Sequence, residues 1–153
     1  MDQVTDRLWI GAEEDGKDWA TLQAKGVTAV VNLAQITDGW TVEQKDGIPY
    51  VRLDQADGAE ISDATFDRFL AFCKQTGLDG RVLLVHCGAG VSRAATFTIV
   101  WLMWVNPSWT WNRAEAAVKS VRDKISPNAV LVESALQHMR ARPHEFLNPG
   151  VAR

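Results

Sequence analysis

The chain has 153 residues and a mass of 16.9 kDa, close to the size of about 150 residues typical of one domain, so we expect a single domain over residues 1–153. Hydrophobic residues make up 46% and charged residues 23% of the chain, which excludes a disordered or fibrous protein. The formal net charge of -3 excludes a global basic field, so neither nucleic acid nor a membrane is an expected partner.

The first half of the chain predicts three strands and one short helix. A strand is expected over Leu8–Gly11, and a helix follows over Asp18–Lys25. Two more strands are expected over Thr28–Leu33 and Tyr50–Leu53. The first of these two is apolar without alternation, which is typical of a strand covered on both faces. The softer segments are Thr37–Gly47 and the tail after about residue 143, which we expect to be flexible.

The second half predicts one strand and four helices. A helix is expected from the N-cap at Ser62 to a stop at Gly77, and a buried strand over Arg81–His86 follows. The segment Ser92–Val105 is apolar on nearly every face, so it predicts a buried helix. Two amphipathic helices are expected over Asn112–Lys124 and Asn128–Met139. This alternation predicts an α/β fold with a central, mostly parallel, twisted sheet of four to five strands flanked by helices.

The segment His86–Arg93 joins a buried strand, a glycine-bearing loop and a buried helix, with Cys87 where the strand ends. Loop N–H groups and the positive end of the following helix favour an oxyanion at this point. The guanidinium of Arg93 can bind two phosphate oxygens at once. The predicted phosphate-binding residues are Gly88, Ala89, Gly90, Val91, Ser92 and Arg93.

The same electrostatic field favours the thiolate of Cys87, which is the form that attacks phosphorus. Dephosphorylation also needs a proton for the leaving oxygen, ideally from a carboxylic acid on a separate loop. The loop after the strand at Tyr50–Leu53 offers that acid in Asp57 or Asp54. We interpret His86 as a supporting residue that forms hydrogen bonds rather than as a general base.

The sequence resembles the cysteine-dependent protein tyrosine phosphatases, and within them the small dual-specificity branch. Its match to their His-Cys-x-x-Gly-x-x-Arg signature is His86, Cys87, Gly90 and Arg93, and the likeness extends over nearly the whole chain. The resemblance implies a phosphatase fold and a phosphocysteine intermediate, with no metal or other cofactor. It also implies that Cys87 is the nucleophile and that the general acid is Asp57, thirty residues upstream. Asp54 is the reserve candidate.

One position departs from the family pattern. Members commonly carry Ser or Thr directly after the signature arginine, where the hydroxyl helps the thiolate to leave in the second step, whereas this chain has Ala94. We therefore expect slow breakdown of the phosphoenzyme unless Ser92 or Thr96 compensates, and Thr96 is counted as a supporting residue.

The expected substrates are phosphotyrosine, and also phosphoserine or phosphothreonine, in proteins. An acidic rim around Asp54, Asp57 and Glu60, together with a phosphate loop that has no Lys or Arg before Arg93, disfavours a polyphosphorylated inositol lipid. A phosphoglucan phosphatase is the alternative enzyme, because the chain has seven tryptophans and Ala94 is not foreign to that branch. A phosphate-binding pseudophosphatase without turnover is the non-enzymatic alternative, supported by Ala94.

Two cysteines and no recognisable signal peptide predict a reduced, cytoplasmic protein, which we expect to be a monomer. Cys73 lies on the apolar face of its helix and is interpreted as a core residue, with a disulfide to Cys87 as the alternative. Arg122 and Lys124 are interpreted as a solvated helix face rather than a second phosphate site.

Overall fold

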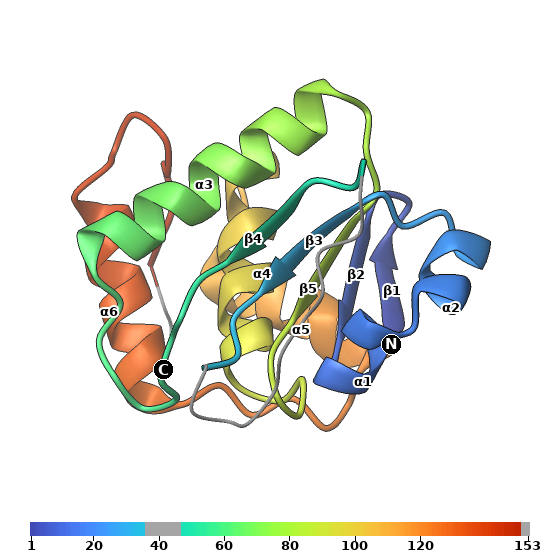
Figure 1. Ribbon diagram of the computed structural model, residues 1–153. Coiled ribbons are helices and arrows are strands. Elements are labelled where there is room, and N and C mark those ends of the chain that lie inside the picture. Colours follow the sequence, from blue (N-terminus) through green and yellow to red (C-terminus); the bar gives the residue numbers. More distant parts are fainter. Residues whose placement is uncertain (36–46, 151–153) are drawn as a thin grey trace.

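The computed structural model describes residues 1–35 and 47–150, so the predicted soft segment Thr37–Gly47 lies outside the described residues except for Gly47. Its sheet has the strands β1 (Asp2–Thr5), β2 (Leu8–Gly11), β3 (Ala29–Asn32), β4 (Tyr50–Arg52) and β5 (Leu83–His86). These five strands lie in the order β1-β2-β5-β3-β4 (Figure 1). β1 runs antiparallel to β2, and the other neighbouring strands are parallel.

Helices cover both faces of this sheet. They are α1 (Glu13–Lys17), α2 (Trp19–Ala24), α3 (Asp63–Leu78), α4 (Arg93–Val105), α5 (Trp111–Val121) and α6 (Ala129–Arg140). The short helices α1 and α2 lie on one face, and α3 to α6 lie on the other (Figure 1). The predicted α/β fold with a mostly parallel sheet is therefore confirmed.

The central strand β5 is buried at every position, as the unbroken apolar run Val82–Val85 predicts. Its side chains alternate between the two faces. Leu83 and Val85 pack into the large core beneath α3 to α6, and Leu84 packs into the smaller core beneath α2. A strand that is fixed on both faces gives the loop that follows it a rigid base.

Several boundaries differ from the prediction. β1 and α1 were not predicted, because β1 is a half-exposed edge strand of four residues and α1 has only five residues, too few for a periodic pattern. Gly77 does not end α3, since the helix continues to Leu78 and Gly80 adopts the left-handed backbone, at φ 68°. The predicted buried helix is confirmed, because α4 is buried from Ala94 to Met103.

Beyond α6 the chain returns to the core. Phe146 is 2% exposed and lies 6.2 Å from the ring of Phe66, measured between centroids. Lys74 on α3 forms an ion pair with Glu145 in the same segment. None of the helices in the described ranges combines the length and apolarity that crossing a bilayer requires.

Candidate active site

The parallel register brings the carboxyl ends of three strands to one edge of the sheet. Asn32 at the end of β3 pairs with both His86 on β5 and Arg52 on β4. The ladder continues one step beyond the strands, because the N–H of Leu33 donates to the carbonyl of His86 at 2.8 Å. The chain after β5, which holds Cys87, therefore starts beside the chain segments that follow β3 and β4.

The sulfur of Cys87 lies at the N-terminus of α4. The N–H of Ala94, in the first turn of this helix of 13 residues, donates to Sγ at 3.4 Å, and Cys87 is 2% exposed. The positive end of a helix stabilises a negative charge placed there. The structure thus puts the predicted nucleophile where its thiolate would be stabilised.

Gly90 is required by the course of the loop. Its φ of 68° lies in the left-handed region, and a Cβ at this position would lie 2.5 Å from the carbonyl oxygen of Gly11. The loop can therefore pack directly against the end of β2 only with glycine at this position. This is a physical reason for the glycine in the sequence signature.

Arg122 supports the loop from beneath. Its Nε donates to the carbonyl of Gly90 at 2.8 Å, its Nη2 donates to the carbonyl of Ala89 at 3.2 Å, and its Nη1 pairs with Asp2 at 2.7 Å. Arg122 is 7% exposed, so its interpretation as part of a solvated helix face is wrong. The predicted helix over Asn112–Lys124 ends at Val121 for the same reason, because Arg122 takes non-helical angles and enters the core.

Two backbone groups bind the neighbouring carbonyls of the loop. The N–H of Glu13 donates to Gly88 at 3.0 Å, and the N–H of Ser126 donates to Val91 at 2.9 Å. With the two carbonyls held by Arg122, four successive carbonyls of the loop, from Gly88 to Val91, have partners outside it. In a trans peptide the N–H points opposite to the C=O, so the N–H groups that follow face the interior of the loop. Converging N–H groups of this kind bind anions.

Arg93 folds back over the loop. Its Nη1 donates to the carbonyls of Gln55 at 3.0 Å and Leu33 at 3.4 Å, which lie in the segments after β4 and β3. A Cβ on Gly88 would lie 3.2 Å from Nη2 of Arg93, so the guanidinium extends across the loop. This placement suits the predicted contact of Arg93 with phosphate oxygens.

Asp57 is joined to the loop through Ser92. The hydroxyl of Ser92 donates to Oδ1 of Asp57 at 2.7 Å and accepts from the N–H of Asn128 at 2.9 Å. The side chain of Ser92 therefore contacts the candidate acid, which the sequence did not predict. Asp54 is exposed in the same segment.

His86 and Thr96 take supporting positions. His86 is fully buried, and burial lowers the pKa of its imidazole to about 4, although a hydrogen bond with the Cys87 backbone and the charge of Asp15 raise it. Its ring packs against Gly16 so closely that a Cβ there would collide with it. The hydroxyl of Thr96 donates to the carbonyl of Ser92 at 3.0 Å, within the first turn of α4.

The second cysteine is separate from this arrangement. Cys73 is fully buried on α3, and burial raises the pKa of its thiol well above its ordinary value. Both cysteines are free thiols. Across residues 1–35 and 47–150, no group of three or more His, Cys, Asp and Glu side chains is arranged to hold a metal ion.

Comparisons with known proteins match this geometry. Residues 8–141 match the family model of the dual specificity phosphatase catalytic domain. The chain is 30% identical over 129 residues to dual specificity protein phosphatase 22-A of Danio rerio, covering 84% of this chain and 60% of that protein. It is 31% identical over 133 residues to dual specificity protein phosphatase 14 of Mus musculus, covering 82% and 62%. The chain thus spans roughly three fifths of the length of these relatives.

Solved structures show the same fold. The human tyrosine phosphatase-like serine/threonine/tyrosine-interacting protein has a TM-score of 0.83 at 26% identity, over 93% of this chain and 97% of that one. Human DUSP28 has a TM-score of 0.82 at 23% identity, over 94% and 99%.

Proposed function

The chain belongs to the dual specificity phosphatase family, and on that premise we propose that it hydrolyses phosphomonoesters through a phosphocysteine formed on Cys87. The observation that carries the proposal is the position of the Cys87 sulfur. It accepts the N–H of Ala94 at the positive end of α4, inside a loop whose carbonyls are bound from outside. This environment favours a thiolate and an incoming phosphate group at the same point.

In the first step the thiolate of Cys87 attacks phosphorus and a sulfur–phosphorus bond forms. The bond between phosphorus and the ester oxygen breaks, and this oxygen takes a proton from the carboxylic acid of Asp57. Arg93 and the inward N–H groups of the loop stabilise the negative charge on the three remaining oxygens. The bond between Ser92 and Asp57 supports this division of roles, because it holds the acid beside the phosphate loop.

In the second step a water molecule attacks the phosphocysteine, and Asp57, now ionised, accepts its proton. The sulfur–phosphorus bond breaks and the thiolate leaves. Ala94 offers this thiolate its backbone N–H but no hydroxyl, and the hydroxyl of Thr96 is already bonded to the Ser92 carbonyl. We therefore propose that breakdown of the phosphoenzyme is the slower step.

We propose phosphotyrosine, together with phosphoserine and phosphothreonine, in proteins as the substrates. A glucan substrate would need an open aromatic face for the sugar rings. The ring of Trp104 stacks on Trp101 at 4.9 Å and has Lys74 5.3 Å from its centroid. Arg113 lies over the ring of Trp109, 4.7 Å from its centroid, and Trp111 is buried. These contacts favour a phosphoprotein over a phosphoglucan.

Hydrolysis of p-nitrophenyl phosphate by the wild type, Cys87→Ser and Asp57→Asn tests the proposal. We expect turnover by the wild type, none by Cys87→Ser, and a loss of about 100-fold or more for Asp57→Asn, the usual contribution of a general acid. A wild type as inactive as Cys87→Ser would overturn the enzymatic function. In that case, binding of a phosphopeptide by the inactive wild type would establish the pseudophosphatase instead.

A further inference from the structure

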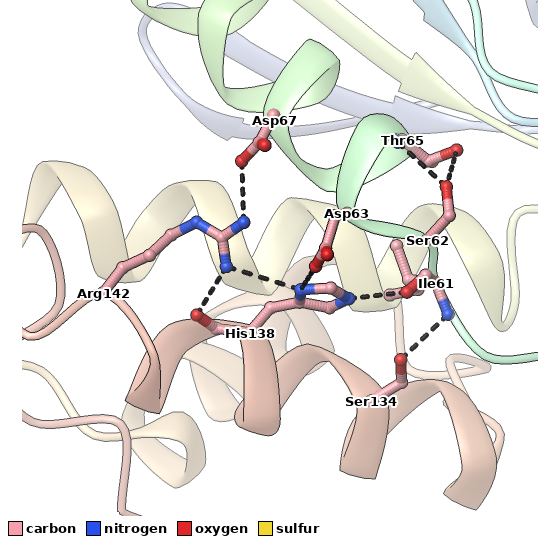
Figure 2. Close-up of polar contacts among 8 residues, drawn as sticks. All are labelled: Ile61, Ser62, Asp63, Thr65, Asp67, Ser134, His138 and Arg142. Atoms are coloured by element: carbon pink, nitrogen blue, oxygen red, sulfur yellow. Dashed lines mark hydrogen bonds and ion pairs between the residues drawn. The ribbon is translucent and has the colours of Figure 1, made fainter.

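The segment that carries Asp57 connects β4 to α3 and is named the acid segment here. Hydrogen bonds hold its C-terminal end to α6. Figure 2 shows the backbone of Ile61, the residue before the N-cap Ser62 of α3, facing two side chains of α6. The N–H of Ile61 donates to Oγ of Ser134 at 2.8 Å, and Nε2 of His138 lies 2.5 Å from the Ile61 carbonyl oxygen. Ser134 and His138, four positions apart on one face of the helix, are named the α6 clamp here.

The clamp is itself held firmly. Ser134 is 6% exposed, and the side chain of His138 is 13% exposed. The imidazole stacks on the ring of Phe66, with 4.7 Å between centroids and 16° between planes. A carbonyl oxygen can only accept a hydrogen bond. Nε2 of His138 therefore carries a hydrogen and donates a hydrogen bond to the Ile61 carbonyl.

The other ring nitrogen of His138 meets a second set of groups. Its Nδ1 lies 3.3 Å from the carboxylate of Asp63 and 3.4 Å from Nη1 of Arg142. Arg142 also donates to the carbonyl of His138 at 2.8 Å and pairs with Asp67 on α3 at 2.7 Å (Figure 2). The ring is therefore fixed between α3 and α6 with its Nε2 directed at the acid segment.

Hydrogen bonds also hold the N-terminal end of the acid segment, just after β4. Arg93 binds the carbonyl of Gln55, and the side-chain amide of Gln55 donates to the carbonyls of Ala56 at 3.0 Å and Ala59 at 3.2 Å. Asp57 lies between this anchor and the one at Ile61, and its side chain is exposed. Its position relative to Cys87 therefore depends on both ends of the segment.

We propose that Ser134 and His138 are positioning residues for the general acid: by holding both backbone groups of Ile61, they keep Asp57 within reach of the leaving-group oxygen. This proposal rests on the proposed function, because it assumes that Asp57 protonates the leaving group. The two residues touch neither the phosphate loop nor Asp57 in the contacts described, so their effect is transmitted through the backbone of the segment.

The decisive test compares leaving groups. Phenyl phosphate releases a strongly basic phenolate that needs a proton from Asp57, whereas p-nitrophenyl phosphate releases a weakly basic one that needs it less. We expect the double variant Ser134→Ala/His138→Asn to lose about 10- to 100-fold in kcat/KM on phenyl phosphate, because kcat/KM reports the first step, and this is the scale of a small misplacement of a catalytic group. The loss in kcat/KM on p-nitrophenyl phosphate should be several-fold smaller.

Two variants of His138 isolate the contact with Ile61. The amide nitrogen of Gln reaches the position of Nε2, so His138→Gln keeps the donor to Ile61 and should restore most of the activity that His138→Asn loses. Glu133→Gln is the matched control, because it breaks an exposed ion pair with Arg140 on the same helix and leaves both bonds to Ile61 intact. It should behave like the wild type with both substrates.

A cycle with Asp57→Asn separates positioning from general damage. In the Asp57→Asn background the clamp variant should cause no further loss of kcat/KM, since no acid remains to be misplaced. An equal loss in both backgrounds, or an equal loss with both leaving groups, would overturn the proposal, as would unchanged kinetics. Thermal unfolding of each variant shows that the rates refer to folded protein. Failure of the proposed function itself would appear separately, as a wild type that hydrolyses neither ester.

Discussion

The hydroxyl of Ser92 donates a hydrogen bond of 2.7 Å to the carboxylate of Asp57, across 35 residues of sequence. The phosphate loop and the candidate acid are therefore joined by a direct contact between side chains. Ser92→Ala removes this bond, and we expect about a 10-fold loss of kcat/KM on phenyl phosphate because the acid is held less well. Ser92→Thr keeps a hydroxyl and is the matched variant. Equal rates for Ser92→Ala and the wild type would show that the bond does not position the acid.

A second prediction concerns the residue after the signature arginine. Ala94 is fully buried and contacts Cys87 through its N–H. In Ala94→Ser the added hydroxyl can donate to the departing thiolate, and a hydrogen bond to a charged group contributes about 1.5–3 kcal/mol, so kcat should rise about 10-fold. Stopped-flow release of p-nitrophenol should show a burst for the wild type and none for Ala94→Ser. Steady release by the wild type from the first turnover would contradict slow breakdown of the phosphoenzyme.

Arg122 gives a prediction that couples stability to ligand binding. Arg122→Met leaves the carbonyls of Ala89 and Gly90 without their partner and should lower the free energy of unfolding by about 2–4 kcal/mol, the cost of two buried acceptors. Urea denaturation measures this loss, and inhibition by tungstate should weaken in the folded variant because the loop is less ordered. Lys119→Met, an exposed change on α5, is the control and should alter neither quantity.

His86 makes stability depend on pH. The pKa of His86 in the folded protein is about 4, below the ordinary histidine value of about 6.5. Between these two pH values the unfolded chain binds a proton at His86 and the folded protein does not. Above pH 6.5 the titration of His86 does not change the free energy of unfolding. As the pH falls from 6.5 toward 4, this free energy decreases by about 3 kcal/mol. The unfolding free energy of His86→Asn should lack this part of the pH dependence. Parallel curves for the two proteins between pH 7 and pH 4 would refute the assignment.

The two cysteines should differ sharply in reactivity. Burial raises the pKa of Cys73, whereas Cys87 lies beside the positive end of α4, inside the phosphate loop. At neutral pH, iodoacetate should add one label to the native protein, on Cys87, and none to Cys87→Ser. Mass spectrometry of tryptic peptides distinguishes the sites, and preferential labelling of Cys73 would be the contrary result.

The sequence was most informative where structure is decided locally. The apolar run of β5, the glycines of the loop and the buried α4 predicted both the central strand and the placement of Cys87, because each depends on neighbours in the sequence. The residues alone left Asp57 and Asp54 as candidates for the acid, and the resemblance to a family chose Asp57 between them. Its partner, the hydroxyl of Ser92, was not assigned that role.

Long-range supports could not be predicted in the same way. Arg122 binds carbonyls 32 and 33 residues away, and Ser134 and His138 bind Ile61 across 73 and 77 residues. An arginine at a helix end, or a serine and a histidine on an amphipathic helix, has the sequence pattern of an ordinary surface residue. Only the packing of α5 against α4 and β1, and of α6 against α3 and α4, reveals their partners.

The carbonyls of the phosphate loop are bound by Glu13, Arg122 and Ser126, which belong to opposite ends of the chain. During synthesis Cys87 emerges from the ribosome well before the last two of these residues. The nascent chain thus passes through a stage in which Cys87 is present but the phosphate loop lacks its hydrogen bonds to Arg122 and Ser126. The capacity to bind phosphate should therefore appear only in chains that extend at least to Ser126.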